Sequence, residues 1–342
     1  MSKRLRNAPT LRDIAEEAGV SVATASRVIN GRGDVSPHTR ELVAQIVRKR
    51  GYIANRTARG LQTGRTGLVG VLVPVVYPVY FSAILAGAIE ALQEHDLRAV
   101  LSPTGREHDR EVGLVDRLLH GLADGALIVL PRESSEELER LLDAGFHFVV
   151  VDPLLPLDDH IPAVSAAHTA GAIQAMQHLL ALGHRRIAAI TGPRGWVATE
   201  DRRQGYQAAL ASAGILPDPQ LEVESDFEVS GGERATRRLL DLPDPPTAIF
   251  AFNDNLAIGA LRAASARGLR VPDELSVVGF DDTEHAALVT PTLTTVRQPL
   301  AEMGRTAVSL LTRLIEEQRV ETLHIELGTR LVVRASSAQA PS

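Results

Sequence analysis

The stretch SVATASRVINGRGDVS, residues 21–36, combines a short helical pattern with a stop signal. Its first residue, Ser21, can cap a helix by accepting a hydrogen bond from the backbone N–H of Thr24. Apolar residues then recur at spacings of three and four, which predicts an amphipathic helix, and the Asn-Gly pair after them tolerates the left-handed backbone of a helix end. These apolar residues are Val22, Ala25, Val28 and Ile29. Small, polar and basic side chains remain on the outer face, so we expect the helix to contact a partner.

Helices are also predicted on either side of this stretch. A capping box from Thr10 to Asp13 opens a helix that runs through Ala18, and a glycine then supplies the tight turn of a helix-turn-helix. Ser36 caps a third helix, which has proline at its first position, where the missing N–H costs nothing. We expect the buried face of the third helix to consist of Leu42, Val43, Ile46 and Val47.

Charge divides the chain into two parts. Residues 1–66 contain 13 lysines and arginines and 5 acidic residues, a net charge of +8, whereas the remaining residues carry −14. A small basic head on a large acidic body is typical of a nucleic-acid-binding protein with a separate second function. The alternative, a solubilising basic tail, does not account for the helix signals throughout this head.

From residue 67 onward, apolar runs alternate with helical patterns. This alternation predicts an α/β fold with parallel sheets, in which ligands bind at the carboxyl ends of the strands. The expected strands are LVGVLVP, RAVLSPT, GALIVLP, FHFVVVD, RIAAITGP, AIFAFND and LSVVGFDD. Their ends hold Asp152, the pair Asn253-Asp254 and the pair Asp281-Asp282, so polar groups accumulate where a ligand site should be.

The stretches TLRDIAEEAGVSVATASRVINGRGDVSPHTRELV and GYIANRTARGLQTGRTGLVGVLVP resemble the lactose-repressor (LacI/GalR) family of bacterial transcription factors. The resemblance implies an N-terminal all-α helix-turn-helix headpiece with a hinge helix, followed by an α/β two-lobed periplasmic-binding-protein-like effector domain. The implied parts are a DNA-binding headpiece over 1–54, a hinge helix and linker over 55–66, and an effector-binding and dimerisation domain over 67–342. The implied lobes cover about 67–165 plus 297–327 and about 166–296 plus 328–340.

The same resemblance implies how the head contacts double-stranded operator DNA. The helix after Ser21 lies in the major groove, and Leu61 of the hinge helix wedges between base pairs in the minor groove. An interior glycine, Gly60, weakens the hinge helix, so we expect it to form only on DNA beside its twin from a second subunit. The alternative interpretation of residues 55–66 is a solvated linker. The implied DNA-binding residues are Thr10, Ser21, Val22, Ala23, Thr24, Ser26, Arg27, Asn30, Tyr52, Asn55, Arg56, Ala58, Arg59 and Leu61.

In the body, the motifs VPVVYPVYF, TGPRGWVATEDRRQGY, FAFNDNLAIGAL and VPDELSVVGFDD carry the resemblance. The aromatic, arginine, asparagine and aspartate residues that the resemblance places at the effector site suit a sugar. Flat aromatic faces can pack on a pyranose ring, while the polar side chains bind its hydroxyls. A structural ion pair between Arg202 and Asp281 is the alternative for those two residues, and plain core is the alternative for Phe81. The implied effector-binding residues are Tyr80, Phe81, Asp152, Trp196, Arg202, Phe227, Asn253 and Asp281.

Other classes of protein receive no support from the residues. The chain has no cysteine, no Walker A loop, no nucleophile elbow and no zinc-protease motif, so we expect neither an enzyme nor a cofactor or metal. The basic head and the missing signal peptide disfavour an extracytoplasmic solute-binding protein, and no apolar run is long enough to span a membrane.

The sequence therefore predicts a cytoplasmic, nucleoid-associated repressor of carbohydrate-utilisation genes. We expect a homodimer, because the C-terminal tail has no leucine heptads for a larger coiled-coil assembly. We expect a mono- or oligosaccharide inducer to release this homodimer from a palindromic operator. The alternative effector is a purine- or nucleoside-type corepressor that strengthens DNA binding. Only the relative affinity of the effector for the two lobe arrangements decides between these signs.

Overall fold

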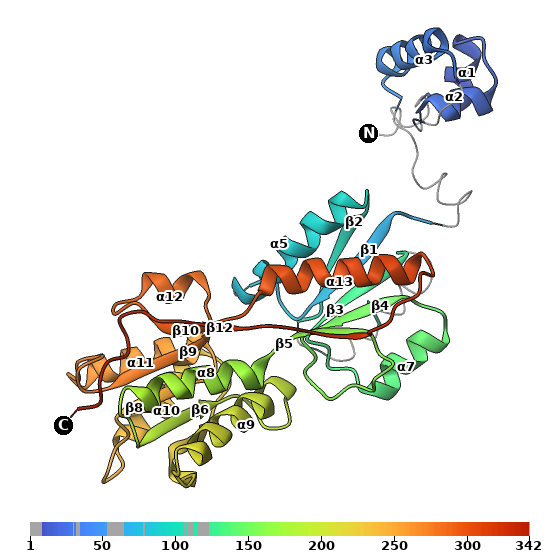
Figure 1. The fold of residues 1–342 in the computed structure, drawn as a ribbon. Helices are drawn as coiled ribbons and strands as arrows, with labels where there is room; N and C mark the ends of the chain where they lie inside the picture. The colour runs from blue at the N-terminus through green and yellow to red at the C-terminus, as the bar shows by residue number, and fades with distance from the viewer. Residues whose placement is uncertain are drawn as a thin grey trace. The chain divides into compact units, whose positions relative to one another are not determined.

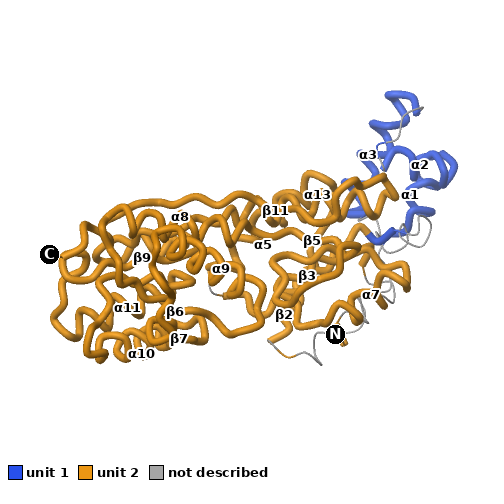
Figure 2. Tube along the Cα trace, turned by 60° about the horizontal axis from the view of Figure 1, so that its bottom comes forward, with its two compact units in different colours: residues 1–66 blue, residues 67–342 orange. Residues whose placement is uncertain are grey.

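The computed structural model describes residues 9–29, 31, 35–52, 65–77, 79–105, 107, 113–114 and 123–341. The chain divides into two compact units, residues 1–66 and residues 67–342, which are coloured separately in Figure 2. No helix in these described ranges is long and apolar enough to cross a bilayer.

Unit 1 contains the three predicted helices, α1 (Leu11–Glu17), α2 (Val22–Ile29) and α3 (Pro37–Arg50). All three predicted caps are confirmed, because the hydroxyls of Thr10, Ser21 and Ser36 each accept a hydrogen bond from the backbone N–H three residues on. The prediction for Leu42 is wrong, since its side chain is 37% exposed. Val43 and Ile46 form the buried stripe, and Leu42 lies one residue, about 100° of helix rotation, to its side.

Unit 2 is built on two six-stranded sheets with the same strand order. The order is β11-β5-β4-β3-β1-β2 in the first sheet and β12-β10-β9-β8-β6-β7 in the second, and every neighbouring pair is parallel except β10 with β12. The first sheet comprises β1 (Leu68–Val73), β2 (Arg98–Pro103), β3 (Gly125–Val129), β4 (Phe148–Val151), β5 (Ala163–Ala166) and β11 (His324–Leu327). The second comprises β6 (Ile187–Thr191), β7 (Glu222–Glu224), β8 (Ala248–Ala251), β9 (Ser276–Asp281), β10 (Thr294–Arg297) and β12 (Arg330–Val332).

All seven predicted strands are therefore confirmed, as β1 to β4, β6, β8 and β9. The five strands that were not predicted span only three or four residues each and lack a continuous apolar run. In both sheets the strand order reverses beside the first strand, between β1 and β3 and between β6 and β8. Such a reversal is where open α/β sheets bind ligands.

Helices cover both faces of each sheet (Figure 1). The first sheet with its helices forms the first lobe, in which α5 (Val79–Glu94) and α13 (Leu300–Ile315) lie side by side on one face and α7 (Ser135–Asp143) packs on the other. The second sheet forms the second lobe, with one helix pair on each face. These pairs are α8 (His168–Ala181) with α9 (Val197–Ser212), and α10 (Val229–Leu240) with α11 (Asp254–Ala266). The short helix α12 (Glu284–Leu288) packs into the same core cluster as α10 and α11.

The chain crosses between the two lobes three times. The crossovers lie between β5 and α8, between β10 and α13, and between β11 and β12. Backbone hydrogen bonds tie them to their surroundings: Ala167 N–H donates to Leu327 O at 2.8 Å, and Gln298 N–H donates to Asp281 O at 3.2 Å. A relative movement of the lobes must act on these three short segments.

Glycines let the helices α5 and α13 approach closely. A Cβ on Gly304 would lie 2.2 Å from the carbonyl oxygen of Ile84 and 2.8 Å from the nitrogen of Ala88. Replacing Gly304 with alanine should therefore push the helices apart and lower the free energy of unfolding by about 1–3 kcal/mol. Denaturant unfolding of the purified variants measures this. Gly328→Ala is the control, because a Cβ there meets nothing within 4 Å, and equal stability of the two variants would contradict the packing argument.

Candidate functional site

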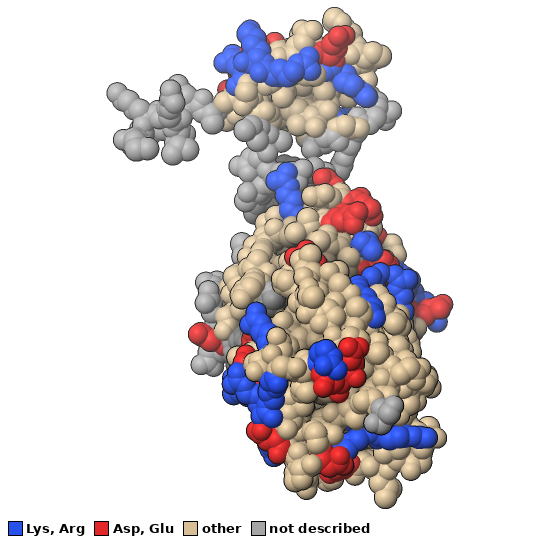
Figure 3. Space-filling view, turned by 90° about the vertical axis from the view of Figure 1, so that its left-hand side faces the viewer, with Lys and Arg blue, Asp and Glu red and all other residues tan. Residues whose placement is uncertain are grey.

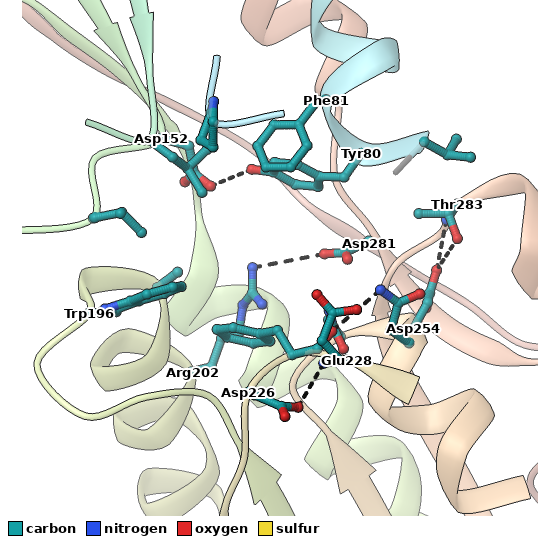
Figure 4. Close-up of a pocket in the computed structure, with 18 of the residues that line it drawn as sticks. Tyr80, Phe81, Asp152, Trp196, Arg202, Asp226, Glu228, Asp254, Asp281 and Thr283 are labelled. Carbon is teal, nitrogen blue, oxygen red and sulfur yellow. Dashed lines mark hydrogen bonds and ion pairs between the residues drawn. The ribbon is translucent and has the colours of Figure 1, made fainter. Parts of the chain in front are cut away.

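A pocket lies between the carboxyl ends of the two sheets and encloses about 1130 Å³, its open mouth included. Both lobes line it, and Figure 4 shows Tyr80, Phe81 and Asp152 of the first lobe opposite residues of the second. The structure brings all eight predicted effector residues together in this lining. These are Tyr80, Phe81, Asp152, Trp196, Arg202, Phe227, Asn253 and Asp281.

Aromatic side chains form two pairs in the pocket. The rings of Trp196 and Phe227 stack, with centroids 5.8 Å apart and planes 29° from parallel. Tyr80 and Phe81 meet edge to face at 5.3 Å. Phe81 also belongs to the buried first-lobe core, which was the alternative considered for it, and it lines the pocket as well. The stacked pair offers a flat apolar wall to a ligand.

Arg202 is the buried cation of the site, with 3% of its surface exposed. Its guanidinium lies 3.9 Å from the centre of the Phe280 ring, and Nη1 donates to the carbonyl oxygen of Phe252. Nη2 lies 3.9 Å from Asp281 Oδ1, so the ion pair considered from the sequence is present. Gln298 Nε2 donates to the same aspartate oxygen at 2.7 Å.

Asp152 anchors the first-lobe side of the pocket. Its carboxylate accepts a hydrogen bond from the Tyr80 hydroxyl and lies 3.0 Å from His168 Nε2. Burial by itself raises the pKa of this carboxyl, but the interactions with His168, Tyr80 and Arg202 outweigh it and hold the pKa below its usual value. Asp152 is therefore a charged acceptor at neutral pH.

Asn253 is engaged by its own protein neighbours. Its Oδ1 accepts a hydrogen bond from the backbone N–H of Leu256 at 2.8 Å and caps α11, and its Nδ2 donates to the carbonyl oxygen of Phe227 at 3.1 Å.

Three residues of the pocket lining have a positive backbone φ: Phe227 at +63°, Asp152 at +54° and Asp281 at +120°. Each such conformation costs about 1–3 kcal/mol and is typical of functional sites.

Several lining residues were not predicted. They are Thr104, Arg132, Asp226, Glu228, Asp254, Asn255, Thr283 and His285, together with apolar neighbours. Thr104 directly follows β2, so the rule that ligands bind at strand ends could have found it. Its hydroxyl and the Nε of Arg202 are buried and, among the residues described, have no hydrogen-bond partner. Polar atoms of this kind can be satisfied by a ligand.

Asp254 is a buried residue of the pocket lining and accepts hydrogen bonds from Thr283 and Thr295. Burial raises its pKa to about 7. Between pH about 4 and 7 the folded chain therefore keeps a proton on Asp254 that the unfolded chain has lost. The stabilisation that this proton gives to the fold decreases as the pH rises over this range and is absent above pH about 7. We expect the stability of the wild type to fall relative to Asp254→Asn by up to about 1.4 kcal/mol per pH unit over this range.

Thermal and denaturant unfolding at pH 4.5 and pH 8 measures the difference. The matched control is Asp273→Asn, whose side chain is 65% exposed and which should follow the wild type at both pH values. A constant gap between Asp254→Asn and the wild type would contradict the protonated state of Asp254.

In unit 1, helix α2 presents Val22, Ala23 and Arg27 to solvent, with Thr24 and Ser26 half-buried. The hydroxyls of Thr10 and Ser21 are engaged in caps, and Tyr52 packs against the small headpiece core. On the face drawn in Figure 3, basic side chains gather on unit 1, whereas both signs are interspersed over unit 2. The other predicted DNA-binding residues lie outside the described residues: Asn30, Asn55, Arg56, Ala58, Arg59 and Leu61.

Comparisons with known proteins agree with this organisation. Residues 10–55 match the family "Bacterial regulatory proteins, lacI family", and residues 176–337 match a periplasmic binding protein-like domain. The chain is 38% identical to the HTH-type transcriptional regulator CelR of Thermobifida fusca, over 97% of this chain and 99% of CelR.

Two solved structures are similar over nearly the whole chain. A complex of the transcriptional regulator CelR with cellobiose has a TM-score of 0.74 at 36% identity and covers 96% of this chain and 99% of its own. The Lac repressor dimer bound to operator and the anti-inducer ONPF has a TM-score of 0.87 at 31% identity, covering 97% of this chain and 100% of its own.

Proposed function

Because the chain belongs to the LacI family of DNA-binding transcriptional regulators, we propose that it represses carbohydrate-utilisation genes and that a mono- or oligosaccharide releases it from a palindromic operator. The observation that carries this proposal is the pocket itself. A stacked pair, Trp196 and Phe227, lines the same pocket as several carboxylates and a buried arginine, and together these groups suit the apolar face and the hydroxyls of a sugar ring. The cellobiose bound to the related CelR supports the same class of ligand.

The division of the chain supports a division of labour. We assign DNA recognition to residues 1–54, the hinge to residues 55–66, and effector binding and dimerisation to residues 67–342. Helix α2 would enter the major groove with Val22 and Ala23 toward the bases, while Arg27 contacts the backbone. Two heads of a homodimer would then read two half-sites of one operator, as two-fold symmetry requires.

The sign of the response follows from linkage. A ligand that binds one lobe arrangement more tightly shifts the protein toward that arrangement, and the operator responds only if it prefers the other. An inducer therefore lowers operator affinity, whereas a purine-type corepressor would raise it. The stacked aromatic pair could also hold a flat base, so the experiment must include both classes of compound.

The test starts with selection of an operator from random double-stranded DNA by the purified protein. Thermal stability is then measured with cellobiose, other mono- and disaccharides, nucleosides and purines, and each stabilising compound is added to the operator complex. Stabilisation by a saccharide that also releases the DNA is the expected result. Stabilisation by a purine or nucleoside that tightens DNA binding would contradict the assigned effector while leaving the DNA-binding assignment intact.

A further inference from the structure

A chain of polar contacts crosses the floor of the pocket from one lobe to the other. It begins at the Tyr80 hydroxyl, which donates to Asp152, and continues over 3.0 Å from Asp152 Oδ1 to His168 Nε2. His168 Nδ1 then lies 3.2 Å from Arg202 Nη2. His168 is therefore the link between the anchor of the first lobe and the buried cation of the second.

His168 occupies a crossover rather than the pocket lining. It is the first residue of α8 and directly follows the segment that leaves the first sheet after β5. His168 is 1% exposed, and its ring centroid lies 5.9 Å from that of Phe280. The residue is not part of the pocket lining. A ligand cannot touch this ring, so any effect of His168 on ligand response must act through Asp152 and Arg202.

The partners determine the hydrogen-bonding state of the ring. A guanidinium can only donate, so Nδ1 of His168 accepts from Arg202. The remaining nitrogen, Nε2, then carries the proton and donates to the Asp152 carboxylate. Both ring nitrogens are thus used, one toward each lobe, and a displacement of the Arg202 guanidinium breaks or strains the contact that orients Asp152.

We propose that His168 is a positioning residue that transmits ligand binding at Arg202 to Asp152 and so couples pocket occupancy to the arrangement of the lobes. This inference rests on the proposed effector function of the pocket. The second crossover strengthens it, because Gln298 holds Asp281 in the same way, through a 2.7 Å hydrogen bond from a buried side chain. Two of the three crossovers therefore contact the pair that a ligand would engage: His168 contacts Arg202, and Gln298 contacts Asp281.

The experiment separates ligand binding from ligand response. The protein has one tryptophan, Trp196, and it lines the pocket, so its fluorescence reports sugar binding directly. The response is the ratio of operator affinities without and with sugar, measured with cellobiose and a panel of other mono- and disaccharides. His168→Phe removes both ring nitrogens and keeps a ring against Phe280, while His168→Gln restores one donor and one acceptor.

We expect His168→Phe to bind sugar within about tenfold of wild type but to lose at least tenfold of the response, about 1.4 kcal/mol of coupling. His168→Gln should recover most of it. His168→Asn, which is too short to reach both partners, should behave like His168→Phe and serves if that variant does not fold. The control is His184→Phe, which alters another fully buried histidine of the second lobe, hydrogen-bonded to Thr247 and Ser276; it should lower stability and keep the response.

The outcomes distinguish the two levels of the argument. A wild-type protein that no sugar in the panel releases from operator contradicts the proposed function, and with it this inference. A wild-type protein that is released, together with a His168 variant that responds equally well, contradicts the role of His168 alone. Loss of response in His184→Phe as well would show that the effect is general destabilisation and would also overturn the assignment.

Discussion

Replacing Arg202 with methionine should leave a protein that binds its operator and no longer responds to sugar. Arg202 is the only cation buried in the described lining of the pocket, and it is held above Phe280 and beside Asp281. A hydroxyl bound by a buried guanidinium would lose a charge-assisted hydrogen bond and leave its neighbours unpaired. We expect sugar affinity to fall at least 100-fold, about 2.7 kcal/mol.

The fold should tolerate this substitution. Burial raises the pKa of Asp281 well above its usual range, and Arg202 works against that increase. Without Arg202 the pKa of Asp281 rises further, which favours a neutral carboxyl over an unpaired buried charge. Methionine still fills the space of the arginine stem. Circular dichroism and thermal unfolding check that the variant is native.

Titration of Trp196 fluorescence and operator gel shifts measure the effect. The matched control is Arg203→Met, on the same helix but outside the lining, where the arginine pairs with Glu222 at 2.7 Å. That variant should bind sugar as the wild type does. Normal release of DNA by sugar in Arg202→Met would remove Arg202 from the effector site and leave it a structural residue.

Charge reversal at Arg27 should have a similarly large effect on operator binding. Arg27 is exposed in the last turn of α2, the helix that we assign to the major groove. A glutamate there would remove a cation from the DNA-facing surface and set a negative charge against the phosphates. We expect operator affinity to fall at least 100-fold at 0.1 M salt, with a smaller salt dependence of the binding constant.

Fluorescence anisotropy with labelled operator at several salt concentrations measures both quantities. Arg238→Glu, an exposed arginine of α10 in unit 2, is the control for the same change in net charge. It should alter operator affinity far less. Equal losses in the two variants would mean that overall charge, rather than the α2 surface, determines affinity.

The sequence predicts most of the architecture because its strongest signals are local. Caps such as that of Ser36 depend on adjacent residues, and the central strands are continuous apolar runs. The edge strands β7, β11 and β12 have only three or four residues, and their pairing partners decide their conformation. Leu42 shows the limit at the level of one side chain, since the apolar run of the third helix does not say which of its members lies at the edge of the buried stripe, and Leu42 is 37% exposed.

For the pocket, the family resemblance supplied the eight residues that the structure brings together. The residues that support them could not be found in this way. His168 contacts Asp152 and Arg202, which are 16 and 34 positions away in the chain, and it is one of 11 histidines. Only the folded chain places its two nitrogens between an acceptor and a donor, so no local pattern distinguishes it.

The order of synthesis gives the three crossovers a further consequence. Strands β11 and β12 are separated by only Gly328 and Thr329, yet they complete the edges of different sheets. Neither lobe can complete its sheet until β11 and β12 have been synthesised, and both sheets are then completed at nearly the same moment. A chain that ends early would expose the free edges of β5 and β10 together, and such edges readily pair with other chains. We therefore expect truncated products of this gene to aggregate or be degraded rather than to yield a functional single lobe.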